Sequence, residues 1–200
     1  SFGIVAYHSV VVAGANDLRL YYDTGWTLPD RTDWHRFTCL ATSTDGVNWI
    51  KPHLGVATFL NSTANNIVWP RDWRDNTHAA GTVFIDTNPA TPLERRFVAF
   101  NDQVYTSADG FSFALASSSR HLSFSDTQQA GYFDSSIGQY RLYFRTHHHG
   151  SRPCPGGEMT DRSVGTITVA NLSAAEITAY AEKNTDGMTY YGTLGPVRPF

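Results

Sequence analysis

Carboxylate side chains flank several short apolar segments of this sequence and could carry acid–base chemistry. Asp126 precedes one apolar segment, Asp23 begins a stretch expected to be a loop (23–35), and Glu158 lies in a second expected loop (146–162). Cleavage of a glycosidic bond uses two carboxyl groups, one protonated to assist the leaving oxygen and one ionised as nucleophile or base. The expected catalytic residues are therefore Asp126, Asp23 and Glu158, with Asp126 placed best. The alternative for Asp126 is a capping or turn role.

Polar and aromatic side chains near the same segments fit the recognition of a sugar. Aromatic rings stack on the apolar face of a sugar, and planar polar groups bind its hydroxyls. His8 and His78 stand at the entries of equivalent strands, where they would bind hydroxyls, share a metal with Asp126 or line a polar core. We favour hydroxyl binding, and the expected substrate-binding residues are His8, His78, Arg145, Gln128, Trp26 and Trp73. The competing role for the tryptophans is packing between sheets.

Metal and cofactor chemistry has little support in the sequence. Residues 147–149 are consecutive histidines, but Gly150 and Pro153 follow them in what reads as an exposed loop, so no metal is expected. Neither a glycine-rich phosphate loop nor a strained nucleophile turn occurs, and no cofactor is predicted. Cys39 and Cys154 either form one disulfide or remain two buried thiols.

The composition is that of a globular protein. Of the 200 residues, 41% are hydrophobic and 14% are aromatic, which excludes a disordered chain. The formal net charge is -3, so no broad positive field favours nucleic acid. Apolar runs are far shorter than the roughly 20 residues that a membrane helix needs. We expect carbohydrate as the partner, with no nucleic acid and no membrane span.

A turn motif recurs along the chain and indicates a repeated module. Residues 43–49 and 107–113 share the pattern Ser-x-Asp-Gly-x-x-aromatic, in which Asp accepts backbone hydrogen bonds and Gly supplies a positive φ. Three strands of similar alternation occur at an average spacing of about 61 residues, each after another apolar strand. These strands are Leu18–Tyr22, Arg96–Phe100 and Tyr140–Phe144. The acids expected to serve first-to-second turns are Asp17, Asp86 and Asp134.

Four antiparallel strands in about 60 residues is the size of one propeller blade, and about three blades fit this chain, whereas propellers close with four to eight. We therefore expect an all-β fold, a β-propeller of four-stranded antiparallel blades in one domain over residues 1–200. The blades are expected at about 4–62, 76–118 and 123–195. Other chains or missing blades would complete the ring. The start at Ser1, without Met or a leader, fits a processed product or an excised portion.

Five groups of residues carry a resemblance to a known family. They are 18–22, 41–55, 65–68, 84–96 and 125–146. In their order and spacing they resemble the glycoside-hydrolase-like five-bladed propellers related to β-fructosidases and α-L-arabinanases. The resemblance covers most of the chain and implies a funnel at one end of the axis, which holds a sugar and receives carboxylates from successive blades. The chain departs from that family at Ala6-Tyr7-His8, where the first inner strand would carry an Asp.

The expected function is that of a glycoside hydrolase-like protein that hydrolyses or binds a glycan in the axial funnel. The alternative is a catalytically inactive propeller that binds glycans or serves as a structural module of an extracellular assembly. A third hypothesis is a propeller that binds protein and no sugar. Glycosylation sequons occur at Asn61 and Asn171, but about two are expected by chance in a chain rich in Ser and Thr, so they carry little weight for the location. The expected protein is extracellular or secreted.

Overall fold

The structure is a computed structural model that describes residues 5–27, 34–72, 82–100, 104–117, 128–148 and 161–172. These residues form three antiparallel sheets and one short 3₁₀ turn, so the all-β expectation is confirmed. The first sheet has the order β1 (Val5–Gly14), β2 (Asp17–Thr27), β3 (Trp34–Ser43) and β4 (Ile67–Trp69). The second has the order β5 (Thr82–Ile85), β6 (Phe97–Phe100), β7 (Val104–Ser107) and β8 (Ala114–Ser117), with the 3₁₀ turn at Leu93–Arg95. The third comprises β9 (Ala130–Asp134), β10 (Gln139–His148) and β11 (Asp161–Val169), again in chain order.

The two repeated turns have the same internal hydrogen bonds. Asp45 accepts the N–H groups of Val47 and Asn48 at 2.8 Å each, and Asp109 accepts those of the matching residues at 2.8 and 3.0 Å. Gly46 has φ +76° and Gly110 has φ +75°, a region that favours glycine. The sequence pattern therefore predicted both turns correctly, because the hydrogen bonds that close them are local.

The strand boundaries differ from the sequence-based expectation in three places. The stretch 23–35 was expected to be a loop, but β2 continues to Thr27 and β3 begins at Trp34. Similarly, β10 continues to His148 and β11 begins at Asp161, inside the stretch expected to be a loop. The fourth strand of the first sheet, β4, lies beyond residue 62, where the first module was expected to end. Polar residues extend these hairpins because ladder hydrogen bonds, rather than an apolar pattern, hold their outer ends.

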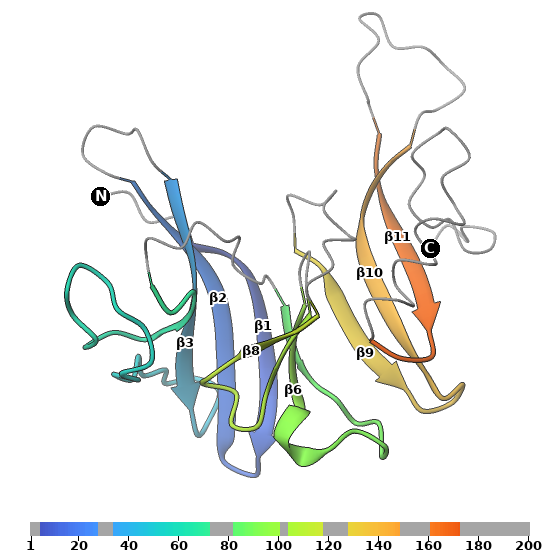
Figure 1. The fold of residues 1–200 in the computed structure, drawn as a ribbon, viewed down its shortest axis with the longest axis horizontal. Helices are drawn as coiled ribbons and strands as arrows, with labels where there is room; N and C mark the ends of the chain where they lie inside the picture. Colours follow the sequence, from blue (N-terminus) through green and yellow to red (C-terminus); the bar gives the residue numbers. More distant parts are fainter. Residues whose placement is uncertain are drawn as a thin grey trace, which may run out of the picture.

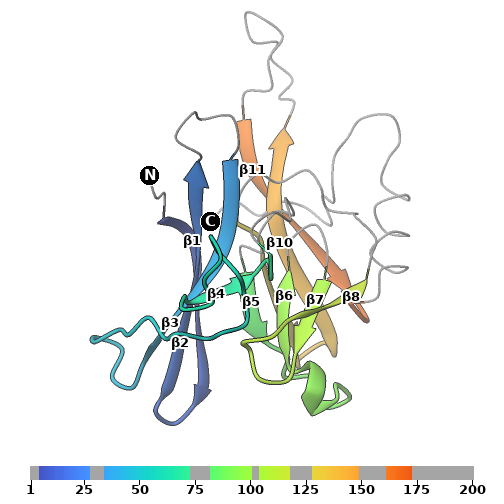
Figure 2. The ribbon, with the colours of Figure 1, turned by 60° about the vertical axis from the view of Figure 1, so that its left-hand side comes forward.

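Two of the three apolar clusters of the described residues lie between sheets. Val11, Tyr21 and Leu40 of the first sheet pack with Val83 and Phe97 of the second. A second cluster joins the other face of the second sheet to the third sheet, through Phe84, Val98, Leu142 and Ile167. The second sheet thus lies between the other two (Figures 1 and 2). A third cluster covers the far face of the first sheet, and its members include Tyr22, Phe37, Cys39, Trp26, Trp49 and Phe59.

The first strands of the three sheets are neighbours in space. β1 contacts β5, and β5 contacts β9. Their starting ends meet, because the N–H of Val83 donates to Ser9 Oγ at 3.0 Å and Gln128 Nε2 donates to the carbonyl of His8 at 2.7 Å. One end of the three-sheet assembly therefore gathers residues from the beginnings of three separate strands.

Other expectations concern cysteine, metal and membrane. Cys39 is a free, buried thiol, and burial raises its pKa to about 12. Cys154, the other residue of the expected pair, lies outside the described ranges. Within the described ranges, no three His, Cys, Asp or Glu side chains cluster closely enough to hold a metal ion. In the same ranges, no helix has the length and apolar character needed to cross a membrane.

Candidate functional site

Asp23 is a buried carboxylate of β2. It lies towards the end of the molecule where β1, β5 and β9, the first strands of the three sheets, begin. It pairs in register with Ala6 of β1 and Thr38 of β3, so it lies in the centre of a three-strand ladder. Side chains alternate along a strand, so Asp23 shares the face of Tyr21, which packs towards the second sheet. Its exposed fraction is 3%, and it was expected in an exposed loop. The extension of β2 past Tyr22 explains this difference.

Two side chains of β3 bind the Asp23 carboxylate. Arg36 Nη2 donates to Asp23 Oδ2 at 2.7 Å, and Thr38 Oγ1 donates to Asp23 Oδ1 at 3.1 Å. Burial raises the pKa of Asp23 to about 7, although Arg36 and Thr38 both act in the opposite direction. Asp23 is therefore a carboxyl group that exchanges a proton near neutral pH while it orients a guanidinium group.

The strand beside this pair has an unusual backbone at Tyr7. Tyr7 has φ +48° and lies at an irregularity in the β1–β2 register between Ala6 and His8. A non-glycine residue in this region costs of the order of 1 kcal/mol and such positions cluster at functional sites. The Arg36 guanidinium lies 5.4 Å from the centre of the Tyr7 ring. We call Tyr7, Asp23, Arg36 and Thr38 the Asp23 site.

Two residues of the expected substrate-binding set lie close to one another at this end. Gln128 holds the His8 backbone through the 2.7 Å hydrogen bond, and the His8 side chain is exposed. Trp26 lies on the opposite face of the first sheet from Asp23, packed edge-on against Phe59 at 5.4 Å. The structure therefore does not bring Trp26 to the Asp23 site.

The other expected site residues cannot be placed as side chains. Arg145 lies in β10 opposite Val164, and only its backbone is described. The expected residues that lie outside the described ranges are Asp126, Glu158, His78 and Trp73.

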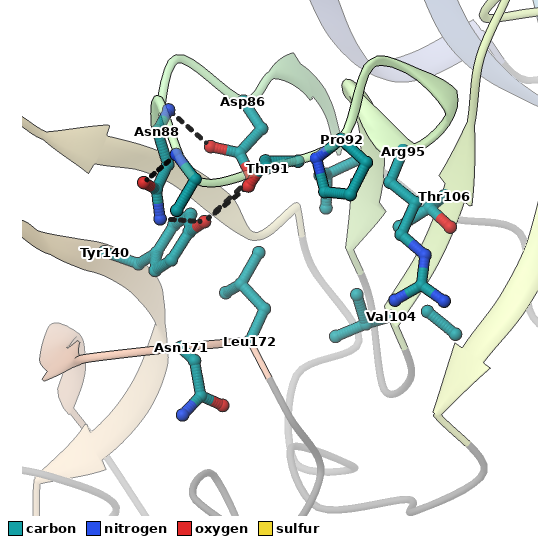
Figure 3. A pocket seen from close by; sticks show the side chains of 13 residues that line it. Asp86, Asn88, Thr91, Pro92, Arg95, Val104, Thr106, Tyr140, Asn171 and Leu172 are labelled. Carbon is teal, nitrogen blue, oxygen red and sulfur yellow. Dashed lines mark hydrogen bonds between the residues drawn. The ribbon is translucent and has the colours of Figure 1, made fainter.

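A cavity of about 400 Å³ lies between the second and third sheets, next to the turn that follows β5 (Figure 3). Its polar wall centres on Asp86, which accepts Thr91 Oγ1 at 2.7 Å and Tyr140 Oη at 2.8 Å on the same oxygen. Its other oxygen accepts the N–H of Asn88 at 2.9 Å. Asn88 Nδ2 also donates to Tyr140 Oη at 3.0 Å. The polar groups around Asp86 are thus hydrogen-bonded to one another, while Arg95 and Thr106 line another part of the cavity.

Of the three expected turn acids, Asp86 and Asp134 accept backbone N–H groups of their own turns, whereas Asp17 binds the side chain of Arg19. Asp17 pairs with Arg19 at 2.8 Å, and Asp134 pairs with Arg141 at 2.6 Å while it accepts the N–H of Ser136. Asp86 serves its own turn but also joins two sheets through Tyr140. Nothing in the local pattern signals that second contact.

Sequence reasoning missed Tyr7, Arg36 and Thr38. A signal was present, because Arg36 and Thr38 alternate with Phe37 and Cys39 as the residues of a half-buried strand do. Comparisons of this chain with protein-family models, with curated proteins and with solved structures gave no match.

Proposed function

We propose that this protein binds a carbohydrate at the end of the molecule where β1, β5 and β9 begin, and that its three sheets are successive blades of a propeller. The contacts of β1 with β5 and of β5 with β9 support the propeller, since the first strand of each blade borders the axis. The strand order within each sheet follows the chain, as it does in a blade. The residue contacts at the shared end support a binding site there.

The observation that carries the proposal is the buried Asp23–Arg36 pair. Asp23 Oδ2 accepts a hydrogen bond from Arg36 Nη2, and the Arg36 side chain remains 24% exposed. A guanidinium held in this way presents its remaining N–H groups in a fixed plane, which suits the hydroxyl pairs of a sugar. The Tyr7 ring beside it offers an apolar face for stacking. Asp23 is thus a positioning residue and Arg36 the binding residue.

The test is binding to an array of oligosaccharides, followed by calorimetry with any sugar that is retained. Arg36→Ala should weaken binding at least tenfold, because it removes the hydrogen bonds of a charged donor. Arg95→Ala is the matched control, since Arg95 is an exposed arginine of the second sheet's turn and lies at the cavity rather than at the Asp23 site. Both variants should keep the far-ultraviolet circular dichroism of the wild type.

Two results would contradict the proposal. One is a wild-type protein that retains no sugar on the array, which would favour a propeller that binds protein. The other is equal loss of sugar binding in the Arg36 and Arg95 variants, which would place the ligand elsewhere.

A second candidate function is glycoside hydrolysis, and the pKa of Asp23 favours it. A carboxyl group with a pKa of about 7 is still half protonated at neutral pH, as a general acid must be. Hydrolysis also needs a second carboxyl group about 5 to 10 Å away, for which Asp126 and Glu158 are the candidates. Aryl glycosides provide the assay, and Asp23→Asn and Asp126→Asn should each abolish turnover. Activity should fall as the pH rises through about 7; turnover that Asp126→Asn leaves unchanged would remove that residue from the mechanism.

A further inference from the structure

Two side chains of the first sheet hold a turn of the second sheet. Tyr21 Oη donates to the carbonyl of Gly110 at 2.9 Å, and Arg19 Nη1 donates to the carbonyl of Asp109. Asp17 holds the other edge of the guanidinium at 3.0 and 2.8 Å. Tyr21 is 1% exposed and the Arg19 side chain is 10% exposed. An arginine and a tyrosine two residues apart on one strand thus recognise two consecutive carbonyls of an Asp-Gly turn, and we call this pair a clamp.

The third sheet carries a second clamp. Arg141 and Tyr143 repeat the spacing on β10, and Asp134 holds Arg141 at 2.6 Å as Asp17 holds Arg19. Tyr140 and Leu142, which alternate with them, pack against the second sheet, so Arg141 and Tyr143 lie on the outer face.

The second clamp is open. The Arg141 side chain is 34% exposed, and within the described ranges it donates to Asp134 and to no turn carbonyl. Tyr132, whose ring stacks with that of Tyr143 at 6.3 Å, is 43% exposed on the same face. This face therefore has hydrogen-bond donors and aromatic surface, and among the described residues no sheet packs on it as the second sheet packs on the first clamp.

The first sheet carries an uncovered turn of the matching kind. The Asp45–Gly46 turn has the hydrogen bonds and the positive φ of the Asp109–Gly110 turn, but both of its central residues are exposed. The Gly46 carbonyl accepts Trp49 Nε1 at 3.2 Å and has a second lone pair for a donor from outside. Val10 and Val12 lie on the outer face of β1, opposite Val11, which packs towards the second sheet. The exposed apolar side chains of this face and its turn are Val10 (56%), Val12 (66%), Val47 (79%) and Ile50 (69%). Uncovered apolar side chains of this kind mark an interaction surface.

We propose that the Arg141–Tyr143 clamp of one chain binds the Asp45–Gly46 turn of a second copy, in the way that Arg19 and Tyr21 bind Asp109 and Gly110 within one chain. Donors then face carbonyls, and the tyrosines face the exposed valines. The contact joins different faces of the two copies, so it runs head to tail, and the smallest closed assembly is a dimer with two such contacts. In that dimer, the outer sheets of the two copies continue the row of sheets seen within each chain.

The test is the oligomeric state of the 200-residue chain, measured by sedimentation velocity over a concentration series up to about 100 μM. A concentration-dependent dimer is expected. Arg141→Ala and Gly46→Ala should each weaken its dissociation constant at least tenfold. A Cβ on Gly110 would lie 2.6 Å from both Arg19 Nη1 and Tyr21 Oη, so a Cβ at Gly46 should prevent entry to a clamp in the same way.

Gly138→Ala is the matched control for Gly46→Ala. Gly138 has φ +65°, so the variant carries the same backbone strain, but nothing lies within 4 Å of its added Cβ. It should leave the dimer unchanged. A mixture of the Arg141→Ala and Gly46→Ala chains gives the strongest check, because each supplies the element that the other lacks. The mixture should restore association through one intact contact, which a general loss of folding would not allow.

Two outcomes would overturn the proposal. The first is a wild-type chain that stays monomeric at 100 μM, and the second is a Gly46→Ala chain that dimerises like Gly138→Ala. Residues 184–190 share the Asp-Gly-x-x-aromatic part of the turn pattern, with Asn184 in place of the serine, and lie outside the described ranges. If Gly187→Ala changes the association and Gly46→Ala does not, the turn that matters is not Asp45–Gly46 and the proposal fails as well.

Discussion

At the scale of single residues, Asp23 shows how position in a ladder changes the chemistry of a carboxyl group. The same side chain in an exposed turn, at Asp45, has its pKa lowered by backbone and side-chain hydrogen bonds from Asn48. At Asp23 the desolvation that comes with burial outweighs Arg36 and Thr38 and raises the pKa to about 7. Asp23 and Asp45 have the same carboxyl group, and their pKa values shift in opposite directions because Asp23 is buried and Asp45 is exposed.

The raised pKa of Asp23 makes stability depend on pH. The unfolded chain loses this proton near pH 4, whereas the folded chain keeps it to about pH 7. The contribution of Asp23 to the free energy of unfolding is therefore fully present below about pH 4 and is lost as the pH rises through 7. The total loss is roughly 4 kcal/mol. Asp23→Asn cannot ionise, so its free energy of unfolding in urea should fall less than that of the wild type between pH 4.5 and 7.5. Glu94→Gln, at an exposed position, is the control; parallel curves for Asp23→Asn and wild type would refute the pKa shift.

Gly110 tests the clamp within the chain. Its φ of +75° disfavours any side chain, and an added Cβ would also meet Arg19, Tyr21 and Phe97 at 2.6 to 2.9 Å. Gly110→Ala should therefore lower the free energy of unfolding by about 1 to 3 kcal/mol more than Gly138→Ala, which has a similar φ and open space. Urea titrations of the two variants give the difference. Equal losses would mean that the clamp yields to the methyl group at little cost.

At the scale of elements, polar contacts between strands of different sheets fix how the sheets lie against one another. The turn after β5 reaches β10 through Asp86 and Tyr140, and the turn after β7 reaches β2 through Gly110 and Tyr21. Each contact joins an element to one that is 50 or more residues away in the chain. Such contacts specify the angle and register of the packing, which apolar side chains alone leave loose.

Tyr140→Phe tests the link between the second and third sheets. The change removes the hydroxyl that donates to Asp86 and accepts from Asn88, and it leaves the ring in the core. The free energy of unfolding should fall by roughly 1 to 3 kcal/mol, the range for hydrogen bonds to a charged group. Tyr132→Phe, on the exposed outer face of the third sheet, should change it by less than about 0.5 kcal/mol. Urea titrations at low protein concentration measure both, and a neutral Tyr140→Phe would show that the link adds no stability.

At the scale of the whole molecule, the three sheets depend on one another because their shared clusters lie between them. The second sheet contributes Val83 and Phe97 to one cluster and Phe84 and Val98 to the other, one set on each face. A sheet of this kind exposes both apolar faces when its neighbours are lost. Loss of any one sheet therefore destabilises the others.

Leu142→Ala tests this dependence with a probe at the other end of the molecule. Leu142 is 0% exposed in the third sheet, so the truncation should lower the free energy of unfolding by about 2 to 5 kcal/mol. All five tryptophans lie between residues 26 and 73, so tryptophan fluorescence reports on the part of the chain that holds the first sheet. The fluorescence midpoint in urea should shift as far as the circular-dichroism midpoint does. A fluorescence midpoint that does not move would show that the first sheet unfolds independently.

Local chemistry made much of the strand pattern predictable. The Asp45 and Asp109 turns, the alternation of β2, β6 and β10, and the turn role of Asp134 rest on residues close in sequence. The candidate site was less accessible to prediction. The expected loop at 23–35 hid both the burial of Asp23 and its pairing with Arg36, because polar residues at the end of a long hairpin read as a turn.

The sequence by itself determined that the chain is all-β, where its tight turns lie and which side chains alternate on each strand, since these depend on hydrogen bonds and sterics among near neighbours. Tertiary structure alone decided which face of each strand is covered. Arg19 and Arg141 have nearly the same local sequence, yet one is closed against Asp109 and the other is open. The difference arises because coverage depends on which sheet packs against the strand, and that partner comes from a distant part of the chain.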